Sequence, residues 1–240
     1  MKIGEIYDLL DALSPFELQE SWDNSGLLVG ERRQEATNVV LSVDIDLEMI
    51  EEAEVGTLFV LHHPLIFKGL KTLDWSGYPA RLLRRMVKKD QSLIAMHTNF
   101  DQTHLNRYVF EEVLGFEGAA CEGFVCIAKG AWRSDTLLEE VKKRLGLGVM
   151  RVVGEHREVR KVALTTGAGG SLMDTVDADL FLTGDIKFHD AMKARAEGLM
   201  LADIGHYESE KPFAEALAPH LKNLPIPVII AQSKNPFTYI

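Results

Sequence analysis

Cysteine is scarce in this chain, and positive charge is in deficit. Only Cys121 and Cys126 occur among the 240 residues, too few for a disulfide framework or a structural zinc site, so we expect two ordinary buried thiols. Lysine and arginine total 26 against 36 acidic residues, a formal charge of -10, which argues against a surface that binds nucleic acid. No apolar run approaches the ~20 residues of a membrane span, and the first residues lack the layout of a signal peptide. We therefore expect a cytoplasmic protein that binds neither nucleic acid nor membrane.

The apolar pattern alternates between short runs typical of strands and longer stretches of helical period. It predicts an α/β fold with much parallel sheet. TLFVLHHPLIF is followed by SLIAMHTNFD, and DLFLTGDIKFH is followed by GLMLADIGHYESE. In each pair the second strand leads into a histidine with an acid four positions on. This weak internal repeat predicts two similar lobes. Strands are expected at 38–43, 57–61, 92–96, 160–165, 179–182 and 199–202.

Four of the eight histidines follow these strands directly. His62 and His63 come after TLFVL, His97 after SLIAM and His206 after GLMLADI. A lone histidine at a strand end is usually an ordinary satisfied polar residue. Because open α/β sheets bind ligands at the carboxyl ends of strands, four such histidines favour one shared site. Imidazoles with nearby carboxylates suit a divalent Zn, Mn, Fe, Ni or Co ion without selecting among them.

Five motifs carry a resemblance to a known family: SWDNSGLLVG, LHHPLIF, HTNFD, TGDIKFHDA and DIGHYESE. In this order and spacing they resemble the GTP cyclohydrolase 1 type 2 homologues, also called Nif-three-like proteins, over essentially the whole chain. The resemblance implies an α/β fold of two similar three-layer lobes with mixed sheets, and two divalent metal ions per subunit in the cleft between the lobes. It also implies a toroidal homohexamer, a trimer of dimers. We place the lobes at 1–120 and 121–240, with the last strand free to return to the first lobe.

Carried over residue by residue, the resemblance implies five metal ligands: His62, His63, Asp101, His206 and Glu210. Asp101 would join one ion, and Glu210 would bridge the two. Neighbouring side chains on a strand point to opposite faces, but the proline after the histidine pair ends regular strand pairing. The sharper prediction is that His62 and His63 bind different ions.

Two histidines are expected to be catalytic. His97 lies close to the ligand positions in the family pattern. His189 follows Asp185 by one helical turn, so both could face one site, and by the resemblance His189 would hold substrate or shuttle a proton.

Three further segments have two interpretations each. SWDNSGLLVG at 21–30 is either an Asx turn before a strand or, by the resemblance, part of the cleft. The glycine-rich LTTGAGGSLMD at 164–174 favours a plain tight turn over an anion seat at a helix N-terminus. RVVGEHREVRK at 151–161 interleaves basic residues with glutamates, which indicates a solvated hairpin rather than a nucleic-acid patch.

Two function hypotheses follow. The first is a metal-dependent hydrolase, in which two divalent ions about 3.5–4 Å apart share a hydroxide that attacks a nucleotide-like or other small substrate. The sequence has no G-x-S-x-G elbow or cysteine nucleophile motif. The family name suggests opening of the guanine ring of GTP, while phosphoester or amide hydrolysis is about as compatible with the same metals. The second hypothesis is a non-catalytic metal-binding or regulatory scaffold.

Overall fold

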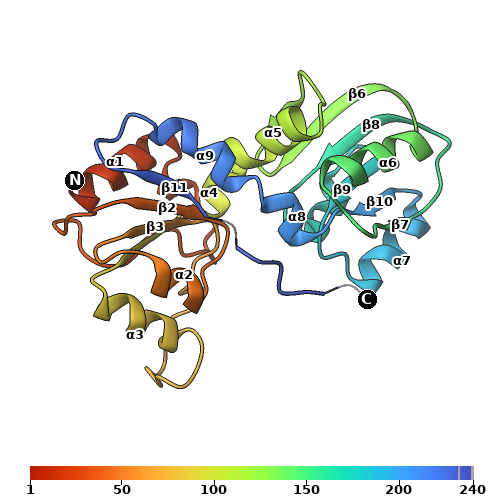
Figure 1. The fold of residues 1–240 in the computed structure, drawn as a ribbon. Helices are drawn as coiled ribbons and strands as arrows, with labels where there is room; N and C mark the ends of the chain where they lie inside the picture. The colour runs from red at the N-terminus through yellow and green to blue at the C-terminus, as the bar shows by residue number, and fades with distance from the viewer. Residues whose placement is uncertain (232, 239–240) are drawn as a thin grey trace. The chain divides into compact units, whose positions relative to one another are not determined.

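The computed structural model describes residues 1–231 and 233–238, and the chain divides into two compact units (Figure 1). Unit 1 comprises Met1–Phe100 and Phe213–Lys234. Unit 2 comprises Asp101–Pro212 and the C-terminal residues from Asn235. The chain thus passes to unit 2 after residue 100 and returns to unit 1 at residue 213. The boundary predicted from the sequence lies at 120/121.

Unit 1 is built on a five-stranded mixed sheet in the order β1-β4-β3-β2-β11, in which only β1 is antiparallel to its neighbour. The strands are β1 (Gly26–Val29), β2 (Val39–Ser42), β3 (Leu58–Leu61), β4 (Ser92–Ala95) and β11 (Val228–Ile230). The helices are α1 (Ile3–Leu13), η1 (Phe16–Leu18), α2 (Leu47–Glu52), α3 (Ala80–Lys88), α4 (Thr98–Phe100) and α9 (Phe213–Leu221). Figure 1 shows α1 and α9 over one face of this sheet and α2 and α3 over the other, so the unit has three layers.

The central strands of unit 1 are buried along their whole length, which explains why they are continuous apolar runs in the sequence. Every residue of β2, β3 and β4 is buried, as expected for parallel strands covered on both faces. Phe59 and Leu93 pack with Met86 of α3 in one core cluster. Burying a side chain of this kind contributes about 1.5–3 kcal/mol. The strands predicted at 38–43, 57–61 and 92–96 are confirmed.

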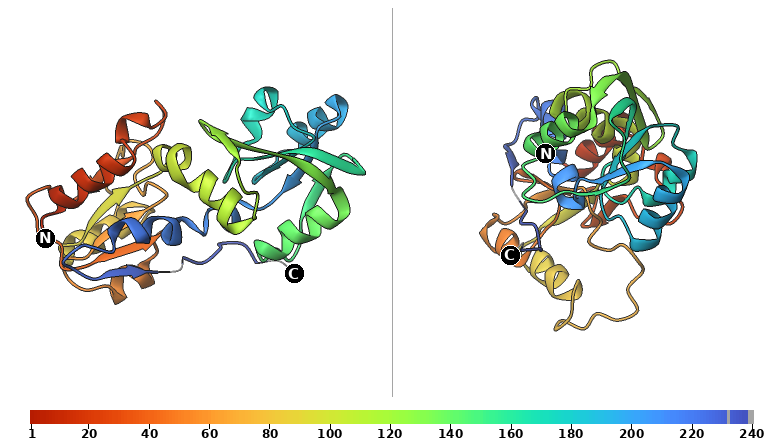
Figure 2. Two further views of the ribbon diagram at one scale, coloured as in Figure 1. Left: turned by 90° about the horizontal axis from the view of Figure 1, so that it is seen from above. Right: turned by 90° about the vertical axis from the view of Figure 1, so that its right-hand side faces the viewer.

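Unit 2 is built on a six-stranded mixed sheet in the order β5-β6-β8-β9-β10-β7. The strands are β5 (Ala120–Glu122), β6 (Val125–Arg133), β7 (Arg151–Val153), β8 (Glu158–Leu164), β9 (Leu180–Thr183) and β10 (Met200–Asp203). The helices are η2 (Asp101–Leu105), α5 (Asn106–Tyr108), η3 (Val109–Val113), α6 (Ser134–Arg144), η4 (Gly170–Thr175), α7 (Phe188–Glu197) and α8 (His206–Glu210). Strands β8, β9 and β10 are parallel, and β6 and β8 form the long antiparallel pair seen in Figure 2.

The two units repeat one topology. In unit 1 a helix, α1, precedes strands that lie in the order β1-β4-β3-β2. In unit 2 α6 precedes strands that lie in the matching order β7-β10-β9-β8, again with three parallel strands and an antiparallel first strand at the sheet edge. The predicted similarity of the two lobes is therefore confirmed, and β3-β4 corresponds to β9-β10 as the repeat in the sequence indicates.

Two expectations from the sequence are wrong. Segment 151–161 is not a hairpin, because β7 pairs with β10 while β8 pairs with β6 and β9. Charge patterning indicated a solvated segment but carries no information about pairing partners. Cys121 and Cys126 are not free thiols but form a disulfide, because the β5-β6 hairpin places them directly opposite each other with 4.0 Å between their Cα atoms.

Within the described residues, no helix is long and apolar enough to cross a membrane.

Candidate metal centre

Three histidines cluster at the carboxyl ends of two neighbouring parallel strands in unit 1. His62 and His63 follow β3, and His97 follows β4. Their potential ligand atoms all lie within 4.8 Å of one another, and their ring centroids are 5.1 to 5.6 Å apart. His62 is fully buried, and the other two are partly buried. The structure therefore brings together three of the histidines that the sequence singled out.

The backbone after β3 explains how adjacent histidines reach one site. In a regular strand, consecutive N–H groups point to opposite sides. Here the N–H of His62 donates to the Ser42 carbonyl (3.1 Å), and the N–H of His63 donates to the Val43 carbonyl (3.0 Å). Both amides point toward the end of β2, so strand alternation has already ended and the two imidazoles need not diverge.

In both His62 and His63, an oxygen atom lies within hydrogen-bond distance of Nδ1. His62 Nδ1 lies 2.9 Å from the Met96 carbonyl oxygen, and His63 Nδ1 lies 2.8 Å from Asp44 Oδ1. Carbonyl and ionised carboxylate oxygens only accept hydrogen bonds, so each Nδ1 carries the proton. In the neutral ring Nε2 is then the nitrogen that would bind a metal, and such outer partners fix the ring orientation of metal-binding histidines.

Asp23, from the SWDN motif, holds His97 in the same way. Its Oδ1 lies 2.8 Å from His97 Nδ1, and its Oδ2 accepts from the N–H (3.1 Å) and the hydroxyl (2.5 Å) of Thr98. Burial alone would raise the pKa of the Asp23 carboxyl, but hydrogen bonds from His97 and Thr98 outweigh it and hold that pKa well below its usual range. The motif thus lies beside the histidine cluster of unit 1, and Asp23 does not form the expected Asx turn, because the Ser25 N–H donates to Gln19 Oε1 (2.7 Å).

Replacing Asp23 with asparagine is expected to lower the free energy of unfolding by about 1–3 kcal/mol at pH 7, because an amide cannot accept from all the donors around it. The pKa of Asp23 is lower in the folded than in the unfolded state, so its charge stabilises the fold above about pH 4, and this stabilisation is lost as the pH falls further. Urea denaturation should therefore show the gap between wild type and variant narrowing below about pH 4.

The control for this prediction is Asp8→Asn, on the exposed side of α1, which should change the free energy of unfolding by less than about 0.5 kcal/mol. A gap between wild type and Asp23→Asn that is equally large at neutral and acidic pH would contradict the role assigned to Asp23.

Unit 2 contributes a histidine and carboxylates at the end of β10. His206 and Glu210 lie four residues apart on α8, and His206 Nε2 is 3.1 Å from Glu210 Oε2. His206 Nδ1 lies 2.8 Å from Asp185 Oδ2. Asp185 adopts a left-handed backbone conformation (φ 53°), which is uncommon outside glycine and concentrates at functional sites. The acid four positions after the histidine thus returns to the same face, as the sequence predicts.

Asp101 is buried at the first position of the π-helical turn η2, a distortion that often marks functional sites. Asn106 Nδ2 donates to the Asp101 carbonyl (3.0 Å), and the Thr166 hydroxyl oxygen lies 3.5 Å from Asp101 Oδ1. The Thr166 N–H in turn donates to Asn106 Oδ1 (2.7 Å). The end of β8 is therefore tied to the segment that carries Asp101.

The glycine-rich turn after β8 supports Glu210 rather than binding an anion. The Gly167 N–H donates to Ser209 Oγ (3.0 Å), and the Gly169 N–H donates to Thr183 Oγ1 (2.8 Å). Both amides are therefore already hydrogen-bonded within the protein. A Cβ atom on Gly167 would lie 2.1 Å from Glu210 Oε1. The tight-turn interpretation is the one that fits, and the sequence did not reveal that this turn packs against a carboxylate.

His189 lies in a different setting from the other histidines. It is exposed in the first turn of α7, and its ring packs edge-on against Phe188 with the centroids 5.5 Å apart. Asp185, one turn earlier in the sequence, contacts His206 instead. Asp44 was not predicted as a histidine partner, and Asp185 was paired with His189 rather than with His206. Both aspartates follow strand ends by two residues, a position that signals a site residue.

The comparisons with known proteins agree with this architecture. The model of the Duf34/NIF3 family (NGG1p interacting factor 3) matches residues 1–236. A Campylobacter jejuni protein named GTP cyclohydrolase 1 type 2 homolog is 48% identical over 240 residues, covering all of both chains. The Helicobacter pylori (strain J99) GTP cyclohydrolase 1 type 2 is 40% identical over 240 residues, covering 99% of each. A crystal structure of a Staphylococcus aureus protein has a TM-score of 0.91 at 27% identity, covering 100% of this chain and 99% of that one.

A second solved structure, reduced HcgD from Methanocaldococcus jannaschii, has a TM-score of 0.81 at 27% identity and covers 96% of this chain and 97% of its own. The family model spans nearly the whole sequence, and both bacterial relatives align with this chain over 99–100% of their length at 40% identity or more. The chain therefore belongs to the Duf34/NIF3 family.

Proposed function

We propose that the chain is a hydrolase that depends on two divalent metal ions, with His62, His63, Asp101, His206 and Glu210 as ligands. The observation that carries this proposal is the histidine cluster of unit 1, whose ligand atoms lie within 4.8 Å of one another. The Nδ1 atoms of all three rings contact oxygens, which is the arrangement typical of metal-binding histidines. Imidazole and carboxylate donors together suit Zn, Mn, Fe, Ni or Co.

When bound, such ions act as Lewis acids on the substrate and make water a better nucleophile near neutral pH. The protein's part is to bind and orient. Asp44 would orient His63 toward one ion and the Met96 carbonyl would orient His62 toward the other, while Glu210 would bridge both. Asp101 would complete one of the two sites.

His97 is proposed to move a proton at Nε2. An aspartate on Nδ1 holds the ring in one tautomer and leaves Nε2 as the nitrogen that would give or take a proton, the arrangement found in enzymes that use histidine as a general acid or base. His189 is proposed to contact substrate, although it lies exposed on α7.

The substrate is proposed to be a small molecule, nucleotide-like or an ester or amide. The printed names of the bacterial relatives contain GTP cyclohydrolase, which supports a nucleotide as the first compound to test. A homohexamer stays a prediction of the family resemblance, and a cytoplasmic location stays a prediction from the apolar pattern of the sequence.

The first test is metal analysis together with turnover on the full-length protein. We expect two divalent ions per chain, placed by anomalous scattering with His62 and His63 on different ions, and hydrolysis of GTP, a nitrophenyl phosphate or a small amide that stops when a chelator removes the ions. One ion bound by both histidines would refute the assignment. Two ions without turnover on any of the three substrate classes would favour the non-catalytic scaffold.

A further inference from the structure

Two aromatic side chains expose large surfaces beside the histidine cluster. Trp22 is 57% exposed and Phe67 is 41% exposed. Their ring centroids are 5.9 Å apart, and they lie 6.2 Å and 6.3 Å from the centroid of the His97 ring. Both rings stand nearly perpendicular to His97, at 80° and 81°. The three rings form one group, which we call the aromatic corner.

The aromatic corner is held in place by its backbone rather than by burial of its rings. Trp22 directly precedes Asp23, whose carboxylate is anchored to His97 and Thr98. Phe67 lies on the long loop between β3 and α3 (Figure 2), and Asn24 Nδ2 donates to the carbonyl of the preceding residue, Ile66 (2.5 Å). Residues 23 and 24 thus anchor the chain beside both rings. A site whose backbone is held in advance loses less entropy when it binds.

We propose that the aromatic corner is a stacking site for a planar heteroaromatic ring of the substrate. This inference rests on the proposed function, since it places the ring next to His97. Aromatic pairs are stable with centroids 4.5–7 Å apart, and a ring stacked parallel to Trp22 would, like Trp22 itself, stand nearly perpendicular to the His97 ring. A stacking role would explain why the SWDN motif has an exposed tryptophan before its buried aspartate, which the metal ligands do not explain.

The alternative occupant is a second copy of this chain covering the same rings. The heteroaromatic ring is favoured because the aromatic corner includes His97, a residue that the proposed reaction uses. The exposed surface of the corner is also small, since only the side chains of Trp22 and Phe67 supply it. An interface between copies would bury many more residues, about 20–30 on each side.

The test uses the fluorescence of Trp22 in the full-length protein. The chain has three tryptophans, so Trp75→Phe with Trp132→Phe leaves Trp22 as the only one. Adenosine and guanosine are titrated as ring probes and ribose as the probe without a ring. We expect both nucleosides to quench Trp22 and ribose to leave it unchanged. Equal responses to ribose and the nucleosides would overturn the inference.

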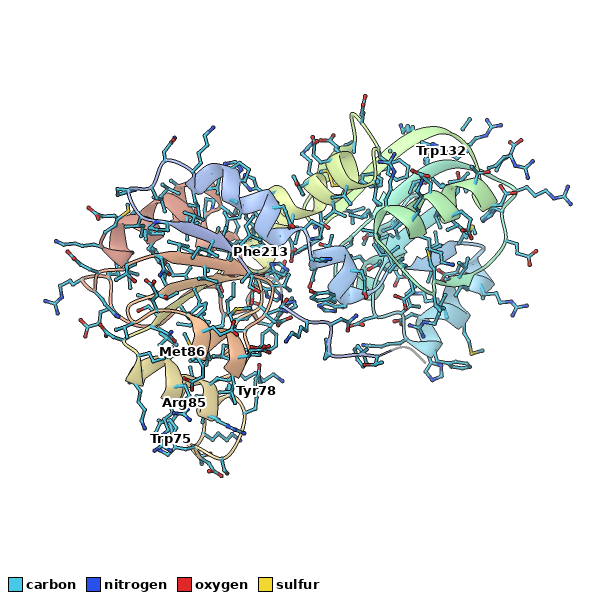
Figure 3. All side chains as sticks on the ribbon, in the orientation of Figure 1. Trp75, Tyr78, Arg85, Met86, Trp132 and Phe213 are labelled. Carbon is cyan, nitrogen blue, oxygen red and sulfur yellow. A yellow bond between two sulfur atoms is a disulfide. The ribbon has the colours of Figure 1, made fainter. Side chains whose placement is uncertain are left out.

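Calorimetry of the same nucleosides measures the size of the effect. Trp22→Leu should weaken their binding about 5- to 100-fold, the range for losing one stacked base. Phe67→Leu should weaken it in the same direction, and Trp22→Phe should restore part of it. The matched control is Trp75→Leu, because Trp75 (labelled in Figure 3) is also exposed in unit 1. Its ring contacts Arg84 of α3 instead. Its nucleoside affinity should be that of wild type.

Two further outcomes separate this inference from the proposed function. Nucleoside binding that depends on Trp22 in a protein without turnover would support the stacking site and count against the hydrolase. Metal-dependent turnover with nucleoside affinity unchanged in Trp22→Leu and Phe67→Leu would overturn the stacking site and leave the hydrolase standing. A change of Trp22 fluorescence with protein concentration alone would show that a second copy covers the corner, which also overturns it.

Discussion

Replacing His63 or Glu210 with alanine is expected to lower metal affinity at least about 100-fold, because even the outer partners of metal ligands are worth 10- to 100-fold. Glu210 is 4% exposed and His63 is partly buried. Each variant should lose at least one ion per chain in metal analysis, and hydrolysis should fall by a similar factor. If Glu210 bridges both ions, its variant should lose more metal than His63→Ala.

The controls are His220→Ala and Glu215→Ala, which change the same residue types at exposed positions of α9. Both should keep the metal content and the turnover of wild type. Turnover that survives in both His63→Ala and Glu210→Ala would contradict the proposal of a dinuclear hydrolase.

Replacing Gly167 with alanine is expected to displace the Glu210 carboxylate, although no proposed ligand is itself replaced. Gly167 has φ 63°, where a side chain costs about 1–2 kcal/mol. Its added Cβ would also lie 2.1 Å from Glu210 Oε1 and 3.6 Å from His206 Nε2. The carboxylate must therefore move, and we expect metal affinity to fall about 10- to 100-fold, as when a supporting group is lost. Calorimetric titration of Mn or Zn measures this directly.

Gly146→Ala separates backbone strain from the contact with Glu210. Gly146 has a similar φ of 68° and is also in unit 2, but an added Cβ there would meet nothing within 4 Å. Both variants should lose about 1–2 kcal/mol of stability to strain, and only Gly167→Ala should lose metal affinity. Equal metal affinity in the two variants would show that the turn after β8 does not position Glu210.

The parts of the fold that the sequence predicts well are those with a strong local signal. Strands β2, β3, β4, β9 and β10 are buried throughout, so each is a largely apolar run. The site histidines come within three residues of the ends of three of them, β3, β4 and β10. The edge strands β5 and β7 have three residues each and are largely exposed, so their periodicity is too short to distinguish. This is why segment 151–161 was predicted as a hairpin.

The supporting residues of the site could not be predicted because they are distant in sequence. Asp23 and His97 are 74 positions apart, and Thr166 and Asn106 are 60 apart. Local pattern shows that each is polar and near a strand end or turn, but only the folded chain pairs them. The role of Gly167 is even harder to predict, because the sequence of a glycine-rich turn does not show whether a carboxylate packs against it or nothing does.

The return of the chain to unit 1 has a consequence for synthesis on the ribosome. Strand β11 forms the edge of the first sheet by pairing with β2, although almost the whole of unit 2 lies between them in sequence. Domains usually fold in order from the N-terminus as they emerge. Here residues 1–100 emerge first but must wait for α9 and β11, whereas the main body of unit 2 is a continuous stretch. The nascent N-terminal half therefore exposes the apolar faces that α9 and β11 later cover, and the continuous body of unit 2, residues 101–212, is fully synthesised before unit 1 is.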